Sequence, residues 1–313
     1  MSFPILGLHH VTATVDDAQA DLDFSVDALG LRLVKKTVNF DNHGVYHFYY
    51  GDEQGKPGTI WTTFPYKGRG VATGTKGAGQ VTVTSFSVPA GSLDSWKLRL
   101  RERGLRVTDA PPRFGEESIV VADPSGLAIE LIANDRDTRT PWKASGIDEA
   151  AAVRGIHSVT LTIRDPAPTV ALMKDLLGFD VVNDMDGRLR VAVNGDEPGK
   201  RIDIAYSAEA QAARNGVGTV HHVAMAITNA DEQLRLREEL VRREIQVTPV
   251  MDRQYFKSIY FREPGGVLFE VATMQPGFAI DEPVAELGRG LKLPPWEEPN
   301  RAEIEAVLPK VSV

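Results

Sequence analysis

Short apolar runs rich in β-branched and aromatic residues recur along the chain, and most of them alternate with segments of helical spacing. In the first instance, residues 5–15 form such a run, and residues 22–29 then carry apolar side chains at i, i+4 and i+7. A pair of Asp residues before this segment supplies an N-cap, and Gly30 ends the helix. Further apolar runs at 31–40, 45–50 and 59–64 complete the pattern. The stretch predicts a strand, a helix and three strands.

The same order of elements occurs four times, at residues 5–66, 80–133, 153–207 and 217–273. The motif G-L-H-H-V-T at 7–12 returns as G-I-H-S-V-T at 155–160 and, in shortened form, as V-H-H-V at 220–223. Similarly, D-P-S-G-L-A-I-E-L at 123–131 is echoed by E-P-G-G-V-L-F-E-V at 263–271. Internal repetition of this kind indicates a fold built from copies of one unit. We therefore predict an α+β protein with four βαβββ modules that form two open-barrel sheets.

A polar stretch that follows the second module is the best domain boundary. It predicts an N-terminal pair of modules at residues 1–140 and a C-terminal pair at 150–280. Residues 281–313 are rich in Pro and lose periodicity, apart from a short helical segment near 301–308. We expect this segment to be an arm that lies on the body. It could also form a subunit contact, which would make the protein a homo-oligomer.

The fourth module carries a His-His pair on its first strand and a single Glu on its last strand. Side chains alternate between the two faces of a strand. His222 and Glu270 therefore both lie on the face with the smaller neighbours, such as Ala224 and Ala272. A carboxylate inside an apolar strand is costly to bury unless it is paired or bound to a metal. An imidazole nearby favours a metal.

Comparison of the modules indicates which positions can supply metal ligands. His10 of the first module aligns with His222, whereas the third module has Ser158 and the second has Val83 at this position. The first module has Thr62 where the fourth has Glu270, so this side of the site is uncharged and could admit a substrate. Glu130 and Asp203 occupy the matching places in modules two and three without a His beside them, and we interpret them as structural.

Two imidazoles and one carboxylate, from His10, His222 and Glu270, form a ligand set that suits non-haem Fe(II) and leaves adjacent coordination positions open. Zn(II) accepts the same ligands, although the helical H-E-x-x-H signature of many zinc hydrolases is absent from the sequence. Mn(II) also remains an alternative.

Composition narrows the classes of partner. The chain of 313 residues has a formal net charge of −8, which gives no general attraction to nucleic acid. There is no Cys, which excludes disulfides and thiolate metal sites and suits a reducing cytoplasm, the expected location. No apolar run approaches the roughly 20 residues of a membrane span, and the N-terminal segment does not fit a signal peptide.

The motifs L-H-H-V-T and D-R-Q-Y-F-K-S-I-Y-F-R-E-P-G-G-V-L-F-E, taken together, resemble those of the vicinal oxygen chelate superfamily, which includes glyoxalases, bleomycin resistance proteins and extradiol dioxygenases. Within it, the chain is most similar to ring-cleaving dioxygenases of the hydroquinone type. The resemblance covers nearly the whole chain. It implies a cytoplasmic enzyme that cleaves a small dihydroxylated aromatic substrate with Fe(II) and O2, with His10, His222 and Glu270 as the metal ligands.

The resemblance also implies catalytic or substrate-binding roles for residues around these ligands. Thr12 fits such a role because it shares the strand face of His10. His9 and His221 fit less easily, since alternation points them away from the ligand face. Tyr260 shares a face with Phe256 in the strand F-K-S-I-Y and could lie over an aromatic ring. Arg253, just before that strand, could bind an oxyanion.

Two other functions remain open at this stage. A glyoxalase-like metal-dependent isomerase or lyase would use carboxylates on both sides of the metal, and Thr62 supplies none. A non-catalytic resistance protein that binds an aromatic ligand would need no metal, so it does not explain a complete ligand set.

Overall fold

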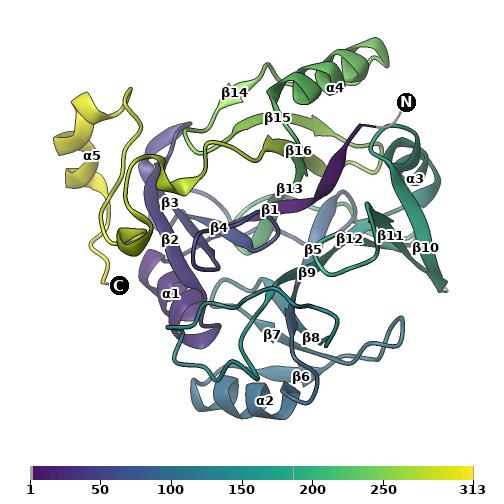
Figure 1. Ribbon diagram of the computed structural model, residues 1–313, viewed down its shortest axis with the longest axis horizontal. Coiled ribbons are helices and arrows are strands. Elements are labelled where there is room, and N and C mark those ends of the chain that lie inside the picture. The colour runs from purple at the N-terminus through teal and green to yellow at the C-terminus, as the bar shows by residue number, and fades with distance from the viewer. Residues whose placement is uncertain (1–2, 186, 313) are drawn as a thin grey trace.

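In the computed structural model, which describes residues 3–185 and 187–312, the apolar runs form two eight-stranded sheets (Figure 1). Each sheet is built from two βαβββ modules, as predicted from the repeats. In the first sheet the strand order is β14-β15-β16-β13-β1-β4-β3-β2, and in the second it is β10-β11-β12-β9-β5-β8-β7-β6. Modules one and four thus share the first sheet, and modules two and three share the second.

The elements of the first sheet come from the two ends of the chain. Module one contains β1 (Ile5–Val15), α1 (Ala18–Leu22), the π-helix η1 (Asp23–Ala28), β2 (Arg32–Asn39), β3 (Asn42–Gly51) and β4 (Ile60–Pro65). Module four contains β13 (Thr219–Ile227), α4 (Ala230–Arg242), β14 (Met251–Asp252), β15 (Lys257–Arg262) and β16 (Leu268–Thr273). Each sheet therefore takes one module from the predicted N-terminal pair and one from the predicted C-terminal pair. The domain boundary at residues 140–150 stays a prediction.

The elements of the second sheet come from the middle of the chain. Module two contains β5 (Gln80–Val88), α2 (Leu93–Glu102), β6 (Val107–Asp109), β7 (Ser118–Ala122) and β8 (Ala128–Ala133). Module three contains β9 (Gly155–Ile163), α3 (Pro166–Asp175), β10 (Phe179–Met185), β11 (Arg188–Val193) and β12 (Arg201–Tyr206).

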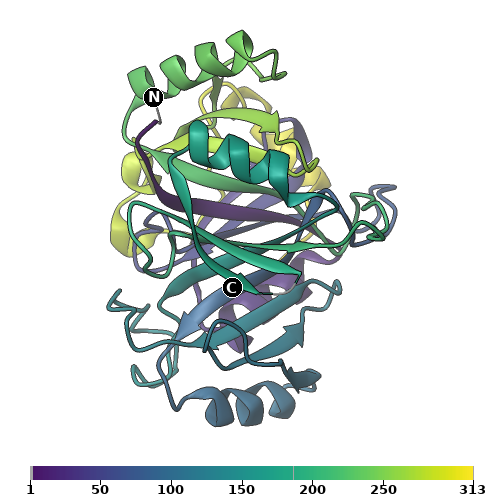
Figure 2. The same cartoon turned by 90° about the vertical axis from the view of Figure 1, so that its right-hand side faces the viewer.

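Helices cover the outside of the sheets, and apolar side chains fill the space between the layers. Figure 2 shows α4, in green, at one end of the molecule and α2, in blue, at the other, with the strands between them. The predicted N-cap of the first helix is Asp17, whose carboxylate accepts from the backbone N–H groups of Gln19 and Ala20. None of the helices in the described ranges is long and apolar enough to cross a bilayer.

The two modules of each sheet meet through antiparallel pairs of their first strands. In the first sheet β1 pairs with β13, and the pairing carries a bulge at His9 on β1 and another at His221 on β13. The β5–β9 pair of the second sheet has bulges at the equivalent positions, Thr82 and His157. A bulge adds one residue to a strand and interrupts the strict alternation of its side chains. This feature re-aims the histidines at the junction.

The C-terminal arm lies on module one of its own chain, beside β2 and β3 (Figure 1, yellow). The arm, residues 281–313, contains the short helices η3 (Val284–Glu286), η4 (Glu298–Asn300) and α5 (Arg301–Val307), and η2 (Phe278–Ile280) directly precedes it. The Lys35 ammonium is fully buried and donates to the carboxylates of Asp281 and Glu282, and Phe278 packs against Tyr49. Asp281 and Glu282 thus join the start of the arm to β2, while a role of the arm in a subunit contact stays a prediction.

Candidate metal centre

Three side chains from three neighbouring strands converge in the curl of the first sheet. His10 comes from β1, His222 from β13 and Glu270 from β16, and all three are buried. Nε2 of His10 lies 3.2 Å from Oε2 of Glu270, and Nε2 of His222 lies 2.9 Å from the same oxygen. The two Nε2 atoms are 3.3 Å apart. The structure therefore brings together the three residues that were expected to form a ligand set.

The contacts among these three groups suit a shared cation. Oε2 of Glu270 is buried, and none of its close contacts has the alignment of a hydrogen bond. Three atoms bound to one ion in mutually adjacent positions lie about 3 Å apart when each bond is about 2.1 Å long. The observed separations match that value. The residues therefore fit a divalent metal held by two His and one carboxylate on one side.

Glu270 is held in its charged form despite complete burial. Burial alone would raise the pKa of its carboxyl, but the neighbouring His10 and His222 outweigh this effect and hold the pKa well below the usual value. Its second oxygen, Oε1, accepts a hydrogen bond from Ser258 on β15. Ser258 thereby fixes the direction in which the carboxylate points, as groups behind metal ligands commonly do.

His9 and His221 lie beside the ligand candidates, whereas strict alternation predicted that they would point away. The bulges are the reason for this error. The Nδ1 atoms of His9 and His10 are 2.9 Å apart, and those of His221 and His222 are 2.7 Å apart. Burial, followed by the neighbouring His10, lowers the pKa of His9 to about 3, so His9 is neutral at pH 7 and can accept a hydrogen bond from Nδ1 of His10. The pKa of His221 is lowered as well, by desolvation and by His222, although much of this residue stays exposed to solvent.

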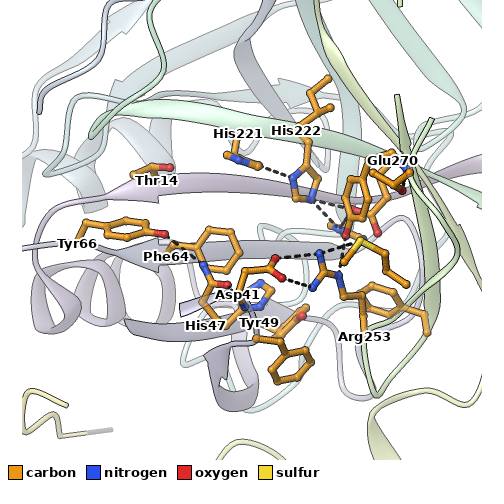
Figure 3. A pocket seen from close by; sticks show the side chains of 18 residues that line it. Thr14, Asp41, His47, Tyr49, Phe64, Tyr66, His221, His222, Arg253 and Glu270 are labelled. Atoms are coloured by element: carbon orange, nitrogen blue, oxygen red, sulfur yellow. Dashed lines mark hydrogen bonds and ion pairs between the residues drawn. The ribbon is translucent and has the colours of Figure 1, made fainter. Parts of the chain in front are cut away.

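A cavity of about 450 Å³ opens next to the three converging residues (Figure 3). Most of the surface of its wall is apolar, and polar or charged side chains contribute the rest. This composition is typical of a site for a small, mostly apolar ligand. The lining residues are His10, Thr14, Asn39, Phe40, Asp41, His47, Tyr49, Phe64, Tyr66, His221, His222, Thr248, Met251, Arg253, Phe256, Tyr260, Leu268 and Glu270.

Arg253, Tyr260 and Phe256, all singled out in the sequence, line this cavity. Nε of Arg253 lies 3.1 Å from the hydroxyl of Tyr260, and Nη2 lies 3.0 Å from the carboxylate of Asp41 across the cavity mouth. Burial, and then the charge of Glu270, raises the pKa of Tyr260, so its phenol keeps its proton. The ring of Phe256 packs 5.2 Å from that of His10.

Thr12 and Thr62 do not line the cavity, and Thr62 contacts His47, a histidine that the sequence analysis missed. Thr62 donates to Thr12 over 2.9 Å, and Nε2 of His47 on β3 lies 2.8 Å from the Thr62 hydroxyl. Neither Thr contributes to the lining, so their predicted contacts with a substrate stay predictions. His47 escaped notice because it lies in the aromatic run Y-H-F-Y-Y, which is also typical of a core strand. The strand of His47 is followed directly by the strand of Thr62, and this succession was the sequence signal that the two residues could be neighbours.

The sequence profile of the Glyoxalase/Bleomycin resistance protein/Dioxygenase superfamily matches residues 7–131 and 155–271. The chain belongs to this superfamily. Among its relatives, MhqE of Bacillus subtilis (strain 168), which carries the provisional name of a ring-cleaving dioxygenase, is 42% identical over 97% of this chain and 99% of its own. The chlorohydroquinone/hydroquinone 1,2-dioxygenase of Sphingobium indicum is 35% identical over 95% of this chain and 94% of its own.

Solved structures agree with the superfamily assignment. The crystal structure of a Bacillus subtilis protein described as a dioxygenase superposes with a TM-score of 0.94 and 39% identity, and it covers 100% of this chain and 99% of its own. Glyoxalase I of Zea mays superposes with a TM-score of 0.63 at 14% identity, over 85% of this chain and 92% of its own. At that level of identity the second likeness concerns the fold alone.

This member of the superfamily has a second, closed version of the site in its second sheet. Ser118 and Glu130 pair there as Ser258 and Glu270 do in the first sheet, and Ser118 donates to Glu130 over 2.7 Å. However, Arg113 donates to both oxygens of Glu130, and its Nε lies 3.3 Å from Asp203, which has the place of Thr62. A guanidinium therefore neutralises the carboxylates that a metal would otherwise bind.

More arginines complete this closed cluster. Arg190 binds Asp203 over 2.7 Å and Glu116 over 2.7 Å, and Arg201 binds Glu116 over the same distance. His157 lies 3.0 Å from Glu116 through its Nε2. Burial would raise the pKa of Glu130, but the ion pair with Arg113 outweighs it and lowers the pKa. Glu130 and Asp203 are thus bound by side chains of the protein, in agreement with their interpretation as structural residues.

Proposed function

We propose that the protein is an Fe(II)-dependent ring-cleaving dioxygenase that acts with O2 on a hydroquinone or a related dihydroxylated aromatic compound. The observation that carries the proposal is the convergence of His10, His222 and Glu270 at one wall of an aromatic cavity. The relatives that cover nearly the whole chain, with names that describe ring-cleaving and hydroquinone dioxygenases, support the same reaction class.

The three converging residues would hold the metal, with their neighbours fixing them in place. Nδ1 of His10 and Nδ1 of His222 would donate to the neutral His9 and His221, which leaves a lone pair on each Nε2 for the metal. Bound Fe(II) would act as a Lewis acid toward a phenolic hydroxyl and offer adjacent coordination positions for substrate and O2.

The other lining residues would bind and orient the substrate. Phe256, Tyr49 and Phe64 give the cavity apolar surfaces against which an aromatic ring can pack. The protonated phenol of Tyr260, oriented by Arg253, can donate a hydrogen bond to an oxygen of the substrate. The ion pair between Arg253 and Asp41 crosses the cavity mouth and would limit the entry of water.

The arrangement favours ring cleavage over the isomerase alternative. Moving a proton between adjacent carbons is best served by carboxylates on both sides of a metal. Thr62 occupies the position across from Glu270, and its hydroxyl is engaged with Thr12 and His47. In the second sheet the position equivalent to Thr62 carries a carboxylate, Asp203, but Arg113 and Arg190 bind it.

Oxygen consumption by the Fe(II)-loaded protein tests the proposal. We expect uptake of about one O2 for each hydroquinone consumed, with loss of the aromatic absorbance, and no turnover of a methylglyoxal–thiol adduct. His10→Ala should abolish the uptake, whereas Ser158→Ala, at the equivalent position of the second sheet, should retain it. Isomerisation of the thiol adduct without oxygen uptake from any quinol would support the isomerase instead. Binding of aromatic compounds without either reaction would support a sequestering protein.

A further inference from the structure

His47 and Tyr49 of β3 both line the cavity, and His47 places an imidazole in this aromatic wall. It projects from the strand that lies three positions from β13 and two from β1 in the first sheet. With a spacing of about 4.8 Å between strands, β3 is roughly 14 Å from β13 along the curled sheet. His47 and the converging ligand candidates therefore line the same cavity from separate strands (Figure 3).

The ring of His47 is held in one orientation. It packs 4.0 Å from the ring of Tyr49 on one side and 4.3 Å from that of Phe64 on another, measured between ring centroids. Its Nε2 is bound to Thr62. Packing and hydrogen bonding that fix a side chain in advance are typical of groups that recognise a ligand.

The hydrogen bonds behind His47 determine which nitrogen carries its proton. A Thr hydroxyl has one proton, and Thr62 gives its proton to Thr12. The oxygen of Thr62 must therefore accept from His47, so Nε2 of His47 carries the hydrogen. Burial, together with the nearby His10 and His222, places the pKa of His47 well below its ordinary value, so the ring is neutral. Its Nδ1 then presents a lone pair, for which the described residues supply no hydrogen-bond donor.

We propose that Nδ1 of His47 accepts a hydrogen bond from the second hydroxyl of the substrate, the one in the para position to the hydroxyl at the metal. This inference rests on the proposed function, since it needs an aromatic ring bound at His10, His222 and Glu270. A hydroxyl at the far end of the ring points toward β3, whereas an ortho hydroxyl stays beside the metal ligands. His47 is thus a specificity residue that distinguishes a hydroquinone from a catechol, and Thr62 is the positioning residue that sets its tautomer.

The test measures binding instead of turnover. Zn(II) accepts the same ligand types without redox chemistry, so the Zn(II)-loaded protein can be titrated with hydroquinone, catechol and phenol in the absence of O2. For the unchanged protein we expect hydroquinone to bind roughly threefold to tenfold more tightly than phenol, as one additional hydrogen bond would give. Calorimetry gives the three dissociation constants.

Variants of the same wall isolate the hydrogen bond. His47→Phe keeps an aromatic ring between Tyr49 and Phe64 but has no acceptor, so the preference for hydroquinone over phenol should disappear while phenol itself still binds. His47→Asn places an amide oxygen near the position of Nδ1 and should restore part of the preference. Thr62→Val removes the acceptor that sets the tautomer and should reduce the preference to an intermediate value. His43→Phe changes an exposed histidine of the same strand and serves as the matched control.

The outcomes separate this inference from the function on which it rests. If the unchanged Zn(II) protein binds phenol and hydroquinone with equal affinity, or if His47→Phe keeps the full preference, His47 does not read the second hydroxyl, and the dioxygenase proposal stands. If the unchanged protein binds none of the phenols and its Fe(II) form consumes no O2, the proposed function fails and the inference fails with it. An unchanged preference in Thr62→Val would overturn the positioning role of Thr62.

Discussion

The two sheets share a framework but neutralise their central carboxylate in different ways. In the first sheet Glu270 contacts two imidazoles at the wall of a cavity, and in the second sheet Glu130 is bound by the guanidinium of Arg113. Arg113 and Arg253 occupy the same place in modules two and four, just before the equivalent strands β7 and β15. Arg113 binds the central carboxylate and closes the second site, whereas Arg253 binds Tyr260 and Asp41 and leaves the first site open.

A single neighbour explains where each arginine goes. Tyr260 pairs with Glu270 across β15 and β16, and it engages Arg253, which also binds Asp41 at the cavity mouth. Val120 has the equivalent position opposite Glu130, where it offers no hydroxyl, and Arg113 reaches the carboxylate. The comparison teaches that a buried carboxylate at this position of the module is paired with a cation where no metal is to be bound, and that an arginine of the protein supplies the charge.

The largest effect should follow from removing the internal cation of the closed cluster. Arg113→Met would leave Glu130 and Asp203 buried with one fewer partner, and we expect a loss of about 3–5 kcal/mol in the free energy of unfolding. Arg253→Met should cost less than about 1 kcal/mol, because its ion-pair partner Asp41 is 64% exposed. Urea unfolding of both variants at pH 7 measures the difference. Equal losses would mean that the two arginines do not differ in role.

A second comparison concerns metal content. Glu270→Gln removes the charged ligand candidate, so the affinity for Fe(II) should fall at least ~100-fold. The variant should therefore lose its Fe(II) during gel filtration. Glu130→Gln and Ser158→Ala alter the equivalent surroundings of the second sheet and should leave the metal content per folded molecule unchanged. Elemental analysis by mass spectrometry gives these values. Normal iron in Glu270→Gln would contradict the assignment of the open site.

The smallest effect concerns the buried carboxyl of Asp21, to which the described part of the chain supplies no cationic partner. Asp21 accepts from Tyr50 over 2.7 Å and from Thr63, and burial raises its pKa from 3.8 to about 7. Between pH 3.8 and about pH 7, Asp21 is protonated in the folded protein but ionised in the unfolded chain, so the free energy of unfolding falls as the pH rises. For this group the loss between pH 6 and pH 8 is about 1.4 kcal/mol.

Asp21→Asn tests this contrast with Glu130, whose pKa is lowered by Arg113. The difference in unfolding free energy between the variant and the unchanged protein should shift in favour of the variant by that amount from pH 6 to pH 8. Thermal or urea unfolding at the two pH values measures it. A difference that does not vary with pH would show that Asp21 is already ionised at pH 6.

The repeated motifs made much of this arrangement predictable. The recurrence of G-L-H-H-V-T and the parallel D-P-S-G and E-P-G-G turns predict the modules, and alternation places His10, His222 and Glu270 on inward faces. The fold follows from short-range patterns that each module repeats. The pairing of module one with module four in one sheet depends on long-range contacts. In the sequence it was indicated only because a shared metal would require His10 of module one to meet His222 and Glu270 of module four.

Two parts of the site could not be obtained from pattern alone. The bulges at His9 and His221 depend on the register between β1 and β13, which single-strand alternation does not contain. His47 and Arg113 belong to segments that look like an apolar strand and a solvated turn, respectively. His47 contacts Thr62 and Arg113 contacts Glu130, and each of these contacts joins two different strands or loops. An alignment of the four modules with one another was a sequence signal for these two contacts.

The joining of β1 to β13 also has a consequence for biosynthesis. His10 and His222 are 212 residues apart, so the N-terminal strand leaves the ribosome long before the strand against which it pairs. Until then, one edge of β1 exposes unpaired peptide groups, which are a template for association with another chain. Until module four has been synthesised, this exposed edge of β1 can pair with a wrong strand of its own chain or of a neighbouring nascent copy.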